Sequence, residues 1–132
     1  MAVPIEDYAL IGDTHTAALV SRQGSIDWLC LPRFDSPACF AALLGDEDNG
    51  HWRIAPEGAE LCTRRAYRPD TLVLDTEWDT AEGSVRVTDL MPQREHAPDV
   101  VRIVEGLGGR VRMRGLLRLR FDYGSVVPWM RR

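Results

Sequence analysis

The sequence predicts an all-β protein, an antiparallel β-sandwich with one short helix, and two observations carry this prediction. Apolar and polar residues alternate along most of the chain, which is the pattern of strands that bury one face. Turn residues, mainly Gly, Pro and Asp, interrupt this alternation at short intervals. About eight short strands with such spacing are typical of a sandwich.

The predicted elements follow one another with short turns between them. The predicted strands are residues 8–12, 16–21, 25–31, 51–55, 61–67, 71–80, 84–91, 99–106 and 110–123. Gly24 closes a turn between the second and the third strand, which predicts a hairpin. Residues 38–44 are the one helical candidate. Ser36 can cap this segment, Pro37 suits a first helical turn and Gly45 can end it.

The last predicted strand, residues 110–123, also concentrates positive charge. Its odd positions are mainly apolar and its even positions mainly Arg, which predicts one face in a core and one outside. Residues 109–132 carry seven Arg and one Asp, whereas the rest of the chain carries nine Arg and nineteen acidic residues. Nucleic acid could bind such a face, but no aromatic side chain stands among the arginines to stack a base. We therefore interpret them as a solvated face that pairs with acids of neighbouring strands, such as Asp75, Glu77 and Asp79.

Length and composition predict a single domain, residues 1–132. The hydrophobic content of 45% is that of a folded globule, and the net charge of −4 gives no reason to expect nucleic acid as a partner. Three cysteines without a C-x-x-C pair predict no disulfide framework. The N-terminus lacks the pattern of a signal peptide, and no stretch approaches the ~20 apolar residues of a membrane span. We expect a soluble, cytoplasmic, reduced protein that does not bind membranes.

We predict no catalytic residue, metal ligand or cofactor in this chain. His15, His51 and His96 are far apart and show no metal-ligand spacing. Glycoside hydrolysis needs two carboxyl groups across a bond, and Asp27 and Asp35 bracket one segment, but loops this short rarely form the necessary pocket. We interpret Asp27 as a strand residue that caps a turn or pairs with an Arg, and Asp35 as a local partner of the backbone.

The most informative stretch is residues 24–40, GSIDWLCLPRFDSPACF. Pro32 and Pro37 restrict the backbone on both sides of an aromatic, a cation and a carboxylate, which a plain connection between strands does not need. Such a stiff polar segment is suited to an interface or to a polyol ligand. The candidate substrate-binding or interface residues are Trp28, Arg33, Phe34 and Asp35.

The four tryptophans divide into two groups. Trp78 lies on the same side of its predicted strand as Leu72 and Leu74, and Trp52 on the same side as Ile54, so both are predicted to lie in the core. Trp28 is predicted to share a strand face with Ile26 and Cys30, yet it lies only a few residues before the proline-bounded loop. We expect Trp28 and Trp129 to be the two that can serve a contact outside the domain.

An ordered series of motifs runs from residue 5 to the end of the chain. Its segments are IEDYALIGD (5–13), TAALV (16–20), GSIDWLCLPRFDSP (24–37), YRPDTLVL (67–74), VTDLMP (87–92), VRIVEG (101–106) and RFDYG (120–124). In this order the segments resemble the N-terminal domain of bacterial glycoside hydrolase family 15 proteins, the glucoamylase and trehalase-like group. The resemblance rests on the whole series, since no single segment is diagnostic.

The resemblance implies a large, supersandwich-like antiparallel domain that precedes a catalytic (α/α)6 barrel. In that family two glutamates of the barrel act as general acid and general base in an inverting hydrolysis of terminal α-glucosidic bonds. Nothing in this chain matches the barrel or either glutamate, so the chain alone is expected to lack hydrolase activity. The domain is expected to pack on the downstream barrel and to lend its loop to the active-site rim, next to an α-glucoside. Composition favours trehalose over maltodextrin as the substrate.

Two other classes of function stay open at this point. The domain could be a free-standing carbohydrate-binding module, which tryptophan fluorescence during a sugar titration would detect. It could instead be an assembly domain that mediates homo-oligomerisation, which light scattering would detect.

Overall fold

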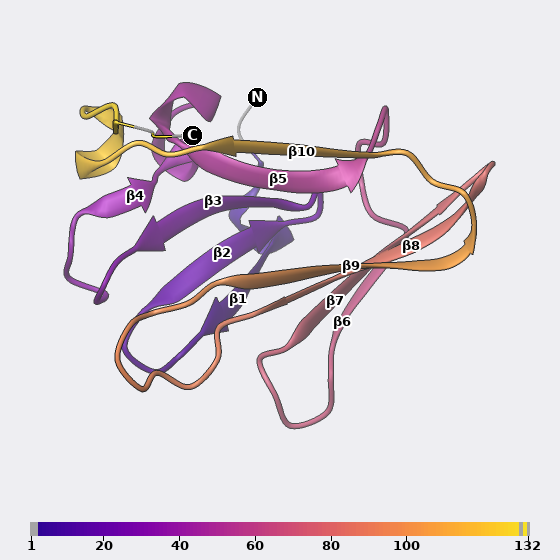
Figure 1. Ribbon diagram of the computed structural model, residues 1–132, viewed down its shortest axis with the longest axis horizontal. Helices are drawn as coiled ribbons and strands as arrows, with labels where there is room; N and C mark the ends of the chain where they lie inside the picture. The colour runs from indigo at the N-terminus through magenta and orange to yellow at the C-terminus, as the bar shows by residue number, and fades with distance from the viewer. Residues whose placement is uncertain (1–2, 130, 132) are drawn as a thin grey trace.

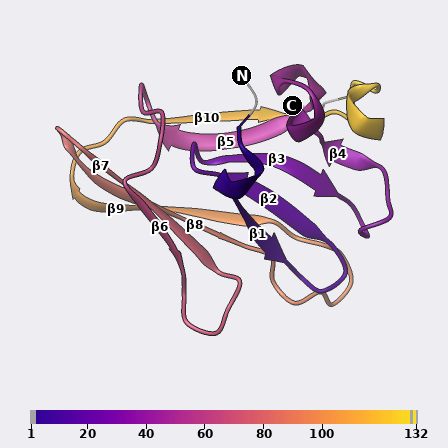
Figure 2. The same ribbon diagram turned by 180° about the vertical axis from the view of Figure 1, so that it is seen from behind.

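The computed structural model describes residues 3–129 and 131, which form two antiparallel β-sheets packed face to face (Figures 1 and 2). The six-stranded sheet has the order β1-β2-β3-β5-β10, and β4 also pairs with β3. Its strands are β1 (Tyr8–Gly12), β2 (Ala17–Ser21), β3 (Ser25–Cys30), β4 (Ala38–Phe40), β5 (His51–Pro56) and β10 (Met113–Arg118). The four-stranded sheet consists of β6 (Arg64–Tyr67), β7 (Leu74–Thr80), β8 (Gly83–Leu90) and β9 (Val101–Gly109), in that order. The all-β antiparallel sandwich is therefore confirmed.

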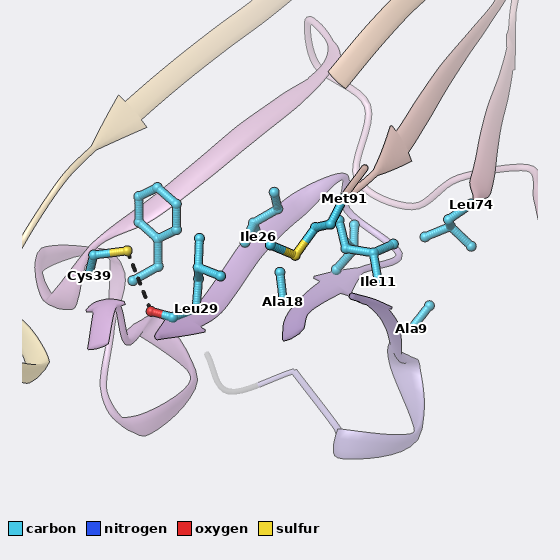
Figure 3. Close-up of a cluster of buried hydrophobic side chains, with 10 residues drawn as sticks. Ala9, Ile11, Ala18, Ile26, Leu29, Cys39, Leu74 and Met91 are labelled. Atoms are coloured by element: carbon cyan, nitrogen blue, oxygen red, sulfur yellow. Dashed lines mark hydrogen bonds between the residues drawn. The ribbon is translucent and has the colours of Figure 1, made fainter. Parts of the chain in front are cut away.

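Two apolar clusters fill the space between the sheets. In the first, shown in Figure 3, Ile11 and Ile26 of the six-stranded sheet meet Leu74 of the other sheet and Met91, which directly follows β8. In the second, Trp78 is almost fully buried. Its buried neighbours there are Ala55, Cys62, Val85 and Val87. Trp78 belongs to the second cluster and the half-buried Trp52 packs against the first, as their shared strand faces with apolar residues predict.

The predicted helix over residues 38–44 is wrong. Ala38–Phe40 forms strand β4, which pairs with β3, and only Ala42–Leu44 forms a single 3₁₀ turn, η2. The physical reason is burial, because four consecutive residues from Ala38 to Ala41 are almost fully buried. A surface helix buries only one of its faces, whereas a short strand covered on both sides buries every residue. Gly45 ends the turn, as expected.

The last strand is shorter than the alternation over residues 110–123 predicts. β10 covers only Met113–Arg118, because its partner β5 begins opposite Arg118 and ends opposite Met113. Beyond the partner, the chain turns into a short 3₁₀ segment, η4 (Asp122–Gly124). The length of a strand is thus fixed by its neighbour as well as by its own pattern. Two further 3₁₀ turns are η1 (Ile5–Asp7) and η3 (Glu47–Asn49).

Two arginines of the last segment, Arg112 and Arg118, pair with acids, but not with those of β7. Arg118 lies 2.6 Å from Asp48, and Arg112 lies 3.7 Å from Glu57. β10 belongs to the six-stranded sheet, whereas β7 lies in the four-stranded one, so the suggested partners are wrong. The three acids of β7 pair instead with arginines of their own sheet. These ion pairs are Arg68–Asp75, Arg64–Glu77, Arg86–Glu77 and Arg64–Asp79.

Within residues 3–129 and 131, no helix has the length and apolar character that a membrane crossing requires.

Candidate functional site

The candidate site is the loop of residues 31–37 that joins β3 to β4, and backbone hydrogen bonds hold it in shape. Ser36 closes a tight turn on Arg33, since its N–H donates to the Arg33 carbonyl at 3.1 Å and its Oγ accepts from the Arg33 N–H at 3.2 Å. The Leu31–Pro32 peptide bond is cis. The Phe34 N–H donates to the carbonyl of His15 at 3.1 Å, which ties the loop to the turn between β1 and β2.

That turn is organised by the buried carboxylate of Asp13. Asp13 accepts hydrogen bonds from the N–H groups of His15 and Thr16, both at 2.9 Å, and from Arg94 Nε at 3.0 Å. The Thr16 hydroxyl donates in turn to the carbonyl of Cys30 at the end of β3. Burial by itself raises the pKa of Asp13, but these hydrogen bonds and the charge of Arg94 outweigh it and hold the pKa below its ordinary value. A buried ion-paired turn therefore supports an exposed loop.

The side chains of the loop point into solvent. Arg33 Nε lies 3.2 Å from Asp35 Oδ1, and these side chains are 69% and 75% exposed. Phe34 is exposed as well, which is unusual for a large aromatic ring. An ion pair this exposed contributes little to stability, so both charges are available to another molecule. The Asp35 carboxylate pairs with the Arg33 side chain. Within the described residues it does not form the expected hydrogen bond to the local backbone.

These side chains line an open hollow of about 360 Å³ together with Thr14 and His15. Thr14 and His15 belong to the turn between β1 and β2. The sequence did not predict them as site residues, because they lie far from the loop in the chain. The hydrogen bond from the Phe34 N–H to the His15 carbonyl brings the two segments together. The hollow offers a guanidinium, a carboxylate, an imidazole, a hydroxyl and an aromatic face. This combination can bind a polyol or a polar protein surface.

Trp28 does not share a face with Ile26, so that part of the prediction is wrong, whereas it does pack with Cys30. In the pairing of β2 with β3, Val20 lies opposite Ile26 and Leu19 lies opposite Trp28, so Asp27 is an extra residue in a β-bulge. The bulge turns Ile26 into the core between the sheets and Trp28 away from it. Trp28 packs in a separate small cluster with Cys30, Ala38 and Ala41.

The half-buried Trp28 ring also meets Tyr123 of η4, with 6.1 Å between the ring centroids. Trp28 thus packs within its own domain and does not line the hollow of the Arg33 loop. Of the four candidate residues, the structure brings together Arg33, Phe34 and Asp35 and places Trp28 in a different environment.

A second hollow, of about 290 Å³, lies on the six-stranded sheet around the buried Asp27. Asp27 accepts hydrogen bonds from the Tyr8 hydroxyl at 2.7 Å and from Ser25 Oγ at 2.6 Å. Burial, and then the bond to Asp27, raise the pKa of Tyr8 well above its ordinary value. Asp27 and Asp35 line different hollows, so they do not form a pair of catalytic carboxylates.

No group of three or more His, Cys, Asp or Glu side chains that could hold a metal ion occurs within residues 3–129 and 131. The side chains that line both hollows can form hydrogen bonds and ion pairs with another molecule.

Comparison with known proteins places the chain in a family. The family model described as "Trehalase-like, N-terminal" matches residues 1–130. A trehalase of Mycobacterium tuberculosis is 43% identical over 88 residues, which cover 67% of this chain and 13% of that protein. A trehalase of Thermoplasma volcanium is 34% identical over 131 residues, which cover 94% of this chain and 21% of the relative.

Trehalase 1 of Sulfolobus acidocaldarius is 34% identical over 122 residues, which cover 92% of this chain and 20% of the relative. The chain thus spans about a fifth or less of the length of these curated relatives. No solved structure gives a significant match. Because the family model covers nearly the whole chain, the chain belongs to the family of trehalase-like N-terminal domains.

Proposed function

We propose that this domain is the non-catalytic N-terminal domain of a family 15 α-glucoside hydrolase of trehalase type. In this proposal it packs against a catalytic (α/α)6 barrel of the same polypeptide and lends the Arg33–Asp35 loop to the rim of the active site. The single observation that carries the proposal is the loop itself, which presents exposed Arg, Phe and Asp side chains on a backbone held by hydrogen bonds.

The geometry of the loop supports a role in binding. Its backbone bonds to Ser36 and His15 are present without a partner, so little conformational entropy is lost when the loop is docked. An exposed Phe34 ring between two charges provides apolar area, and Arg33 provides planar donors for hydroxyl or carboxylate oxygens. The relatives that carry the name trehalase are about five or more times as long as this chain, which leaves ample length for a catalytic domain.

The test is the kinetics of Arg33→Ala in the full-length hydrolase, with trehalose and maltodextrin as alternative substrates. We expect kcat/KM to fall by about tenfold on the true substrate, the scale of about 1.4 kcal/mol in transition-state binding. The matched control is Arg112→Ala, which removes another exposed arginine that also pairs with an acid. The control is expected to leave kcat/KM unchanged.

Three outcomes would overturn the proposal. Full activity of Arg33→Ala, together with a loss of stability, would make Arg33 an internal structural residue. Hydrolysis of trehalose by the 132-residue chain alone would mean that the chemistry lies in this domain. Sugar binding to the isolated chain without any effect of Arg33 on the full-length enzyme would favour a carbohydrate-binding module.

A further inference from the structure

The two open sides of the sandwich are built differently. On the side of β1 and β6, side chains of the four-stranded sheet close the gap. The Tyr67 hydroxyl donates to the Leu10 carbonyl at 2.7 Å and accepts from the Leu10 N–H at 2.8 Å. Arg65 donates to the carbonyls of Asp7 and Val20 at 3.0 and 3.1 Å. This side is therefore sealed by hydrogen bonds between the sheets.

On the opposite side, β9 and β10 are the edge strands of their sheets. Among the described strands, β9 pairs only with β8, and β10 pairs only with β5. Each edge strand therefore has one row of backbone N–H and C=O groups without a strand partner. Figures 1 and 2 show that β9 and β10 diverge from the connection that joins them.

Apolar side chains on the core face of these two strands are exposed. Val104 of β9 lies opposite the fully buried Val87, so it faces the core, yet it is 45% exposed. Leu117 of β10 lies opposite Trp52, which packs on the first cluster, and Leu117 is 47% exposed. Residues that face each other in an antiparallel pair point to the same side of the sheet. Both side chains are therefore on the inner face and uncovered.

Two glycines show the same open space. Gly106 lies opposite the buried Val85, and Gly115 lies opposite Ile54, which packs on the second cluster. A Cβ atom built at either glycine would have no atom within 4 Å. Positions on the inner face of a completed sandwich are close-packed. At Gly106 and Gly115, therefore, no side chains of the opposite sheet cover the inner face.

The edges also lack the usual protection. Natural edge strands are short or carry inward-pointing charges, whereas β9 has nine residues and its inward positions beyond Arg102 are Val104 and Gly106. Exposed apolar surface of this kind marks an interaction site. The free backbone rows require a partner with free backbone groups, which an α-helix does not have and an extended segment does.

From these observations we propose that β9 and β10 are not final edges. They receive further β-strands from the same polypeptide, beyond residue 132, which hydrogen-bond to both edges and cover Val104 and Leu117. The occupant is an extended segment that is apolar at alternate positions. The source is intramolecular because the curated relatives are about five or more times as long as this chain. This proposal does not depend on the role of the Arg33 loop.

The test is amide hydrogen exchange in the full-length protein. We expect every amide of β9 and β10 to exchange at least about 100-fold more slowly than an exposed amide, in a single-chain species at all concentrations. Rapid exchange at alternate positions of these two strands would overturn the proposal. Protection that appears only with a dimeric mass would also overturn it, because the occupant would then be a second copy.

Substitutions in the same full-length protein provide a second test of the proposal. Val104→Asp and Leu117→Asp are expected to reduce the soluble yield at least about fivefold, because each would bury a charge. The matched control is Leu61→Asp, which places the same charge on another exposed leucine and is expected to have no effect. Equal yields for all three variants would contradict the proposal. The hydrogen-exchange experiment uses the unchanged protein, so it remains a test even if a variant does not fold.

Discussion

Asp89 of β8 and Arg102 of β9, which lie opposite each other in the four-stranded sheet, form an ion pair in which neither side chain is exposed to solvent by more than 1%. Arg102 donates to both carboxylate oxygens of Asp89, at 2.7 and 3.2 Å. Its remaining donors bond the carbonyls of Trp52 and Gly24, at 2.6 and 2.8 Å, and its guanidinium lies 5.3 Å from the centre of the Trp52 ring. One arginine thereby fixes the register of β8 against β9 and binds the four-stranded sheet to the six-stranded one.

Removing one member of this pair is expected to destabilise the domain strongly. Arg102→Ala leaves a buried carboxylate without its partner, and Asp89→Asn leaves a buried guanidinium without its counter-charge. We expect each substitution to lower the free energy of unfolding by about 3–5 kcal/mol, measured by urea denaturation.

Arg64→Ala provides the control, since Arg64 is half exposed, and of its partners Glu77 and Asp79 the first keeps its pair with Arg86. Its loss is expected to cost less than about 1 kcal/mol. A loss for Arg102→Ala no larger than that of the control would show that water or the neighbouring backbone replaces the pair.

The sequence predicts several strands closely because alternation is a local property. Residues 8–12, 25–31 and 84–91 appear as β1, β3 and β8 with shifts of no more than one residue at their ends. The Arg33 loop was also predictable, because its prolines, charges and aromatic ring are adjacent in the chain.

Other features depend on which strands become neighbours. The bulge at Asp27 inverts the face of Trp28, and it exists only in the pairing with β2. The Asp89–Arg102 pair requires the register of β8 and β9, which alternation does not specify. The composition of residues 38–41 suits a buried helix as well as a buried strand. These residues include strand β4 because they pair with β3.

Asp13 is expected to make the stability of the domain depend on pH. Its pKa is lowered from the ordinary value of 3.8, because the hydrogen bonds of Thr16 and His15 and the charge of Arg94 outweigh the effect of burial. A lowered folded-state pKa gives stability that is complete above the unfolded-state pKa and is lost as the pH falls through the folded-state pKa. We therefore expect the free energy of unfolding to decrease from about pH 5 to pH 2 more steeply in the unchanged chain than in Asp13→Asn.

Urea denaturation at a series of pH values measures this difference. Arg94→Gln removes one of the groups that lower the pKa of Asp13, so its curve is expected to lie between the other two. At pH 7 Asp13→Asn is expected to lose about 2 kcal/mol, the scale of a hydrogen bond to a charged group. Parallel curves for the unchanged chain and Asp13→Asn would assign the acid sensitivity to other carboxylates.

The three cysteines are expected to be unreactive in the folded domain. Burial raises the pKa of the Cys39 thiol to about 11 and also raises the pKa of Cys30 and Cys62. The thiolate is the reactive form, so alkylation by iodoacetamide at pH 8 is expected to be at least about 100-fold slower than in urea. Leu61→Cys adds a thiol at an exposed position and is expected to react at once, as a positive control. Rapid alkylation of Cys39 without denaturant would mean that β4 opens readily.

The last prediction separates two residues of the candidate site by their effect on stability. Arg33 is exposed and pairs with the exposed Asp35, so Arg33→Ala is expected to change the melting temperature of the domain by less than about 2 °C. Trp28 packs in the small cluster beside Ala38 and contacts Tyr123, so Trp28→Ala creates a cavity and is expected to cost about 3 kcal/mol.

Differential scanning calorimetry of the two variants measures both effects, and Trp28→Phe is the conservative companion that refills most of the cavity. Phe keeps an aromatic ring against Tyr123, so it is expected to recover more than half of the lost stability. If Arg33→Ala proved as destabilising as Trp28→Ala, the loop would be held by its side chains. Its backbone bonds to Ser36 and His15 would then not suffice to keep the loop ready for a partner.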